Sequence, residues 1–164
     1  MYESGGLVYA DSNLFILGTS FGHIDSLYHT FTTDIYLSKL DTRGNVIWSK
    51  KYGNLVNDKA LDLILTTDNN LVFIGETYRN ENNYTYRDLS MFKVNLLGEL
   101  IWQKNFKVNG DIRAKSIKEM KDKGFAIVGS CWEIDSTLRD CQEKADNGSQ
   151  IYILKTDSNG LLQN

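Results

Sequence analysis

The sequence predicts an all-β fold built from three copies of one four-stranded antiparallel unit. Three observations predict it. A glycine-containing motif recurs along the 164 residues at Gly18, Gly75 and Gly129, with spacings of 57 and 54 residues. Runs rich in β-branched and aromatic residues alternate with Asp, Asn and Gly turn clusters, which is typical of hairpins. Many of these runs, such as LFIL, LVFI and FAIV, are apolar at successive positions, as in sheets that are covered on both faces.

Two segments of each copy carry the repeat. The later segment reads DIYLSKLDTRGNVIW from Asp34, DLSMFKVNLLGELIW from Asp88 and QIYILKTDSNGLLQN from Gln150. The earlier segment reads SNLFILGTS, NNLVFIGET and KGFAIVGSC. The copies therefore divide the chain, as one repeat array over 1–164, into units at about 1–53, 54–107 and 108–164.

Each unit is expected to form four short strands. In the second copy ALDLILTTD and NLVFIGETY flank a turn at Asp68–Asn70, and DLSMFKVN and ELIWQKNF flank Gly98. We expect Gly98 to take the positive φ that a tight hairpin with a bulge requires. The segment IRAKSIKEMKDKG from Ile112 could pass for a helix, but it aligns with DKALDLILTTDNN and is therefore read as an innermost strand with a charged turn.

Stacked four-stranded sheets that cover each other's faces are typical of a β-propeller-type fold. Three blades do not close a ring, because propellers need at least about four, and two open sheet edges would remain. We expect either further blades in a longer parent chain or two copies that close a six-bladed ring by a two-fold operation.

The motif also resembles a known family. The propeller-like repeats of secreted and surface proteins from Bacteroidota share a pattern that this chain carries at Asp34, Tyr36, Lys39, Asp41, Gly44, Trp48, Lys50, Tyr52, Gly53, Ala60, Thr66, Asp68 and Gly75. The second copy departs at Asn95, where the pattern has Asp. In that family such arrays commonly precede a sorting domain of the type IX secretion pathway, so the resemblance implies an extracellular or cell-surface location.

A second resemblance concerns the tryptophans. The piece formed by Asp41, Gly44 and Trp48 is similar to the tryptophan-docking motif of propellers related to quinoprotein dehydrogenases. Such a tryptophan packs between neighbouring blades in either family. The resemblance therefore implies that Trp48 and Trp102 are blade-packing residues, and it leaves a cofactor-binding or enzymatic propeller as an alternative.

The net charge indicates which classes of partner to expect, and the cysteines indicate the compartment. A net charge of −3 and a pI near 5.4 disfavour nucleic acid and anionic membranes, which need clustered Lys and Arg. No apolar run approaches the roughly 18 residues of a membrane-spanning helix. Cys131 and Cys141 are close enough in sequence for a disulfide to tie down one loop, which would fit an oxidising compartment. Two unrelated thiols are the alternative.

Candidate chemistry is sparse. His23 and His29 lack a third ligand at a recognisable spacing, and no catalytic fingerprint occurs, so we expect no metal, no cofactor and no enzyme activity. Glu76 follows a strand glycine in the second copy only and is interpreted as a solvated strand end. The aligned lysines Lys39, Lys93 and Lys155 are expected to hold their ammonium groups in water.

The connections between second and third strands carry the functional hypothesis. They are read as long loops at 20–33, 78–87 and 132–149, on one face of the array. Their candidate partner-binding residues are Phe21, Tyr28, His29, Tyr78, Tyr84, Tyr86 and Trp132. Tyr and Trp suit contacts with protein and with carbohydrate, so the sequence predicts a non-enzymatic binding or scaffolding module for a protein or glycan. A purely architectural segment of a larger surface protein is the alternative.

Overall fold

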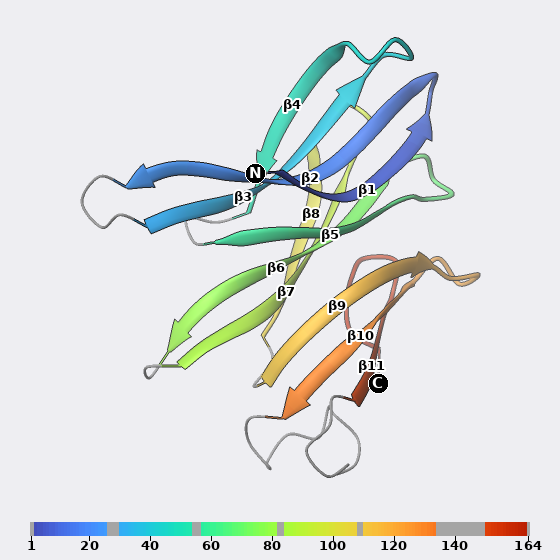
Figure 1. Ribbon diagram of the computed structural model, residues 1–164. Helices are drawn as coiled ribbons and strands as arrows, with labels where there is room; N and C mark the ends of the chain where they lie inside the picture. Colours follow the sequence, from blue (N-terminus) through green and yellow to red (C-terminus); the bar gives the residue numbers. More distant parts are fainter. Residues whose placement is uncertain are drawn as a thin grey trace.

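The computed structural model describes residues 2–25, 30–53, 57–81, 84–107, 110–133 and 150–163, and its regular secondary structure there is β-strand throughout (Figure 1). The strands are β1 (Tyr2–Ala10), β2 (Asn13–Asp25), β3 (Thr30–Leu40), β4 (Val46–Tyr52), β5 (Asp58–Leu65), β6 (Leu71–Glu81), β7 (Tyr84–Val94), β8 (Leu100–Phe106), β9 (Gly110–Glu119), β10 (Phe125–Glu133) and β11 (Gln150–Thr156). The all-β prediction is confirmed. The described part contains no helix with the length and apolar character of a membrane span.

The strands form three successive antiparallel meanders. The first sheet has the order β1-β2-β3-β4, and in the second β5, β6, β7 and β8 pair in turn. The third contains β9, β10 and β11, and Leu162 pairs with Thr156 where a fourth strand would begin. One parallel bridge between Arg87 and Asp111 joins β7 to β9. None of these sheets closes into a ring.

A β-bulge recurs opposite the repeated strand glycine. In the innermost strand of each unit the register shifts by one residue, at Gly5, Leu61 and Lys115, next to the partner of Gly18, Gly75 and Gly129. A Cβ at Gly75 would strike Ile35 Cδ1, and one at Gly129 would strike the Arg113 carbonyl oxygen. The strand glycine therefore leaves room for a close crossing of backbone or of the neighbouring sheet.

The turn between third and fourth strands also repeats. Asp41, Asn95 and Asp157 each accept hydrogen bonds at Oδ1 from the backbone N–H groups two and four residues later, at 2.8–2.9 Å. The turn glycines have φ values of 87° at Gly44, 71° at Gly98 and 73° at Gly160, so the positive φ predicted for Gly98 is confirmed and recurs in the other two copies. Asn95 replaces Asp without loss of the motif, because an amide oxygen accepts the same bonds.

One apolar core lies between the first and second sheets and another between the second and third. The core between the first and second sheets includes Phe15, Leu17, Phe73 and Phe92, and the one between the second and third includes Ile74, Met91, Phe125 and Ile127. Along β6 and β7 alternate residues point to alternate cores, so both faces of the middle sheet are covered, as the apolar runs predict. β5 lies against β1, and β9 lies against β5, which brings the innermost strands of successive sheets together (Figure 1).

Two expectations need correction. The described parts of the segments read as loops at 20–33 and 78–87 are strands: β2 and β3 pair from Phe21 with Thr33 out to Asp25 with Thr30, and β6 and β7 pair out to Glu81 with Tyr84. Their Thr and Tyr content favours paired strands, and the ladder of the underlying sheet continues into them. The segment from Ile112 is strand β9, as predicted.

Candidate functional site

The candidate site consists of two β-hairpin arms, which we define as residues 21–25 with 30–33 and residues 78–81 with 84–87. In Figure 1 both arms run toward the left side of the molecule, away from the turns between β1 and β2 and between β3 and β4. Among the residues whose side chains are described, the apolar cores extend toward the arms as far as Leu17 and Ile35 in the first sheet and Ile74 and Leu89 in the second. The arms continue the strand pairing beyond these core residues as two-stranded ribbons, and such ribbons are marginally stable when they stand alone.

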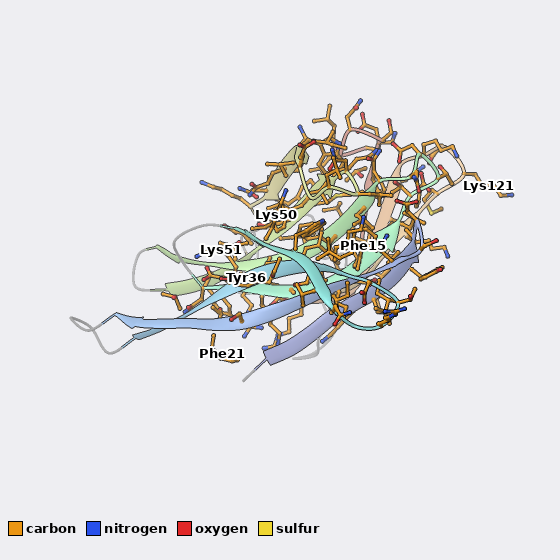
Figure 2. The ribbon with its side chains drawn as sticks, turned by 90° about the horizontal axis from the view of Figure 1, so that it is seen from above. Phe15, Phe21, Tyr36, Lys50, Lys51 and Lys121 are labelled. Carbon is orange, nitrogen blue, oxygen red and sulfur yellow. The ribbon has the colours of Figure 1, made fainter. Side chains whose placement is uncertain are left out.

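The first arm exposes an aromatic side chain. Phe21 pairs with Thr33 and is 41% exposed, and Figure 2 shows it on the outer side of the hairpin, whereas Phe15 lies within the body. The base of this arm is tied to the second sheet, because the Thr33 N–H donates to Asn57 Oδ1 at 3.0 Å. A fixed arm with an exposed phenyl ring is suited to contact an apolar surface of a partner.

The second arm carries a stacked aromatic and cation. Tyr78 and Arg87 are cross-strand partners, and the Arg87 guanidinium lies 5.3 Å from the centroid of the Tyr78 ring. Arg87 also lies 3.9 Å from the carboxylate of Glu76, whose side chain is only 6% exposed. Glu76 is thus buried beside a cation, and its interpretation as a solvated strand end is wrong. The positive charge of Arg87 reduces the cost of burying that carboxylate.

A buried polar network lies below the second arm. Thr77 donates its hydroxyl to Asp58 Oδ1 at 2.6 Å, and Ser90 Oγ lies 3.1 Å from Thr77 Oγ1 and 3.1 Å from Asn105 Oδ1. These residues come from β5, β6, β7 and β8, so the network crosses the whole sheet. Asp58 is fully buried and packs against Gly53, whose φ of 108° brings the chain from β4 close to β5. The network fixes the sheet beneath the arm.

A related ion pair supports the first arm. Lys51 Nζ lies 2.7 Å from Asp34 Oδ1, and the Asp34 side chain is 9% exposed. The hydrogen bond to Asp34 raises the pKa of Lys51 above its ordinary value of 10.5. Asp34 in the first sheet and Asp88 in the second occupy equivalent register positions and are both buried. An ion pair therefore lies at the base of each arm, next to the apolar core: Lys51 with Asp34 in the first sheet and Arg87 with Glu76 in the second.

The described residues contain no group of three or more His, Cys, Asp or Glu side chains that could hold a metal ion. The polar groups under the second arm are carboxylates, hydroxyls, an amide and a guanidinium. Thr77 and Ser90 are hydrogen-bonded to acceptors within the sheet. Their described arrangement is that of a structural network.

Several predicted site residues lie beyond what the structure describes. Tyr28, His29 and Cys141 are outside the described residues. Tyr84 and Tyr86 lie on β7, and Cys131 and Trp132 lie on β10, but only their backbone is described. The binding role of these aromatics and the disulfide stay predictions.

The structure places Trp48 and Trp102 between sheets. Trp48 on β4 packs edge-to-face on Phe15, with ring centroids 6.0 Å apart, and borders the core between the first and second sheets. Trp102 on β8 packs on Phe125 of the third sheet, with centroids 6.2 Å apart. Neither ring lies on an arm.

The aligned lysines do not share one environment. Lys93 Nζ lies 2.7 Å from Asp68 Oδ2, and its side chain is only 11% exposed, so the expectation of a hydrated ammonium is wrong for it. Lys155 makes the equivalent pair with Asp122 at 2.8 Å, where both side chains are about half exposed. Lys39 instead lies 5.4 Å from the Phe15 ring centroid. Lys93 is buried because its sheet is covered on both faces.

No protein-family model matches the sequence, and no curated protein matches it.

Sequence reasoning missed Arg87, the cation that joins Tyr78 to Glu76. The signal was present in the alternation of the segment YTYRDLSMF, which continues the strand pattern N-terminally to Asp88. Reading 78–87 as one hairpin would have placed Tyr78 and Arg87 opposite each other. Treating the segment as a loop removed that register.

Proposed function

We propose that this chain is a β-propeller-type module of the extracellular space or cell surface that binds a protein or glycan without catalysis. The consecutive meanders, the covered middle sheet and the adjacent innermost strands support the propeller-type arrangement. The resemblance to secreted Bacteroidota repeats and the pair Cys131 and Cys141 support the location. Alkylation of the unreduced, denatured protein followed by mass spectrometry tests the disulfide, and two freely alkylated thiols would argue against it.

The hairpin arms carry the functional proposal. Strands that continue beyond the core gain little stability of their own, so their aromatic and cationic side chains are better explained by contact with a partner. Phe21 is exposed, and Arg87 holds the Tyr78 ring in one orientation. Aromatic residues and Arg are the types that contribute most to binding at protein interfaces, and flat aromatic rings also stack on sugars.

The test begins with the wild-type chain on a printed glycan array and on a displayed library of extracellular protein domains. For the partner found, Phe21→Ser and the double variant Tyr84→Ser/Tyr86→Ser are expected to weaken binding about tenfold or more while the unfolding midpoint stays nearly unchanged. Leu97→Ser is the matched control, because Leu97 is 60% exposed on a turn away from the arms. Equal binding by all variants would refute the arm surface.

The purely architectural alternative has its own outcome. If the folded wild-type chain binds neither glycans nor proteins in these screens, the binding proposal fails and the arms serve only the structure of a larger protein.

A further inference from the structure

The three sheets follow one packing rule. In the first two sheets, four apolar positions face the next sheet. Their register relative to the strand glycine defines the same four positions in all three sheets, and we call these positions the trailing face. They are Phe15, Leu17, Ile35 and Leu37 in the first sheet, Val72, Ile74, Leu89 and Met91 in the second, and Ala126, Val128, Ile151 and Ile153 in the third. The trailing faces of the first two sheets are at most 1% exposed per residue.

The trailing face of the third sheet is open in the described structure. Ile151 is 85% exposed, Ile153 68% and Val128 40%. These branched side chains occupy the positions that pack on the following sheet in the other two units. Adjacent apolar side chains on one exposed sheet face mark an interaction surface.

The first sheet presents the complementary face. Leu7 pairs with Ile16, as Leu63 pairs with Phe73 and Ile117 pairs with Ile127. Leu63 and Ile117 are 5% and 3% exposed because they pack on the preceding sheet, whereas Leu7 is 63% exposed. We call the outer positions Leu7, Tyr9, Leu14 and Ile16 the leading face.

The leading face is also hollowed. Gly5, Gly6, Leu7 and Ile16 line an open cavity of about 450 Å³. A Cβ at Gly6 would lie 2.8 Å from Leu63 Cβ of the second sheet, so Gly6 presents bare backbone to the leading face. The cavity offers space for an apolar side chain of an incoming sheet.

We propose that the trailing face of the third sheet binds the leading face of the first sheet in a second copy of this chain, head to tail. The occupant is a second copy because the open trailing face requires a sheet with the leading-face pattern, and this chain carries that pattern uncovered at its other end. The contact would continue the interface already formed twice within the chain. Because the two surfaces differ, the interface is heterologous, and it closes a ring or extends as a filament according to its rotation.

The test measures the mass of the 164-residue chain by analytical ultracentrifugation over a wide concentration range. We expect concentration-dependent association, either to a closed species or to growing oligomers. A monomer at the highest concentrations would overturn the proposal. Leu7→Lys and Ile153→Lys each place a charge in one of the two faces, and each variant alone is expected to be monomeric.

Mixing the two variants is the decisive step. Leu7→Lys retains an intact trailing face and Ile153→Lys an intact leading face, so an equimolar mixture should form a complex of two copies held by one interface. If instead Leu7→Lys alone still dimerises as the wild type does, the third sheets pair with each other and the head-to-tail proposal is wrong. A mixture that stays monomeric also overturns it.

Ile101→Lys provides the control. Ile101 is 50% exposed and lies in the bulge of β8 in the middle sheet, outside both faces. This variant should associate like the wild type, and loss of association in it would show that any added lysine suffices. Circular dichroism and thermal unfolding of each variant verify that it is folded before its mass is interpreted.

Discussion

The far end of the Trp48 indole lies on Gly98, the turn glycine of the following sheet. A Cβ at Gly98 would lie 2.9 Å from Trp48 Cη2, and one at Gly160 would lie 3.1 Å from Trp102 Cη2. The turn glycine therefore has two functions, since it adopts a positive φ and also leaves room for the tryptophan of the preceding sheet. At Gly44 nothing lies within 4 Å of such a Cβ.

This difference predicts unequal effects of alanine. Gly98→Ala combines left-handed backbone strain with overpacking against Trp48, and we expect a loss of about 2–4 kcal/mol in the free energy of unfolding. Gly44→Ala has the backbone strain alone and should cost about 1–2 kcal/mol. Urea unfolding monitored by tryptophan fluorescence measures both. Equal losses would show that Trp48 does not constrain the turn.

The repeat made most of this fold predictable. Gly44, Gly98 and Gly160 mark the same turn, and the residue runs around them have the strand pattern, so strand type and order follow from the sequence. The way the sheets contact each other does not. The contact between Trp48 and Gly98 depends on the distance between successive sheets. Side-chain packing determines that distance.

The ion pair between the buried Lys93 and the half-exposed Asp68 predicts acid sensitivity. Burial by itself would raise the pKa of Asp68, but hydrogen bonds from Lys93, Thr66 and Asn70 outweigh it and lower the pKa from 3.8 to about 2. A lowered folded-state pKa stabilises the protein fully above pH 3.8, and that contribution is lost as the pH falls toward about 2. Because the Asp68 side chain is 52% exposed, we expect Asp68→Asn to cost only about 1 kcal/mol at pH 7.

The equivalent pair in the third sheet is the control for this prediction. Asp122 and Lys155 are both about half exposed, and Asp122→Asn should destabilise less than Asp68→Asn at neutral pH. Unfolding free energies measured between pH 2 and pH 7 should converge for Asp68→Asn and wild type at the acid end. A constant difference across that range would rule out the ionised pair as its cause.

Two residues of the turn between third and fourth strands differ together between the first and second copies. Asn95 stands where the first copy has Asp41, and Glu99 stands where it has Asn45. Asn45 Nδ2 donates to Asp41 Oδ2 at 2.8 Å, and in the next copy Asn95 Nδ2 donates to Glu99 Oε2 at 2.7 Å. The amide and the carboxylate have changed places. Asn95→Asp alone would put two carboxylates in contact and should cost about 0.5 kcal/mol, less at high salt. The double variant Asn95→Asp/Glu99→Asn should recover wild-type stability, and additive effects in thermal unfolding would contradict the coupling.

The candidate site was less predictable than the fold. Burial of Glu76 depends on Arg87, a cross-strand partner that is identified only when the hairpin register is known. Phe21 was identified as an aromatic of the connection, but its place on a paired strand was not, because turn and strand residues alternate in FGHIDSLYHTFTTD. The local composition shows that aromatic residues are present, whereas the strand register determines which side chains they contact.

Tyr52 predicts loss of stability in alkali. Its hydroxyl donates to the Gly98 carbonyl oxygen at 2.8 Å, and burial raises its pKa from 10.0 to about 12. Since the neutral phenol is favoured in the folded state, its contribution is full below pH 10 and is lost as the pH rises toward about 12. Tyr52→Phe should cost about 1 kcal/mol at pH 7, because the Gly98 carbonyl keeps a hydrogen bond from Lys50 at 3.3 Å. Between pH 10 and 12 the unfolding free energy of Tyr52→Phe should fall less steeply than that of the wild type, and parallel curves would show that Tyr52 has the same pKa in the folded and the unfolded protein.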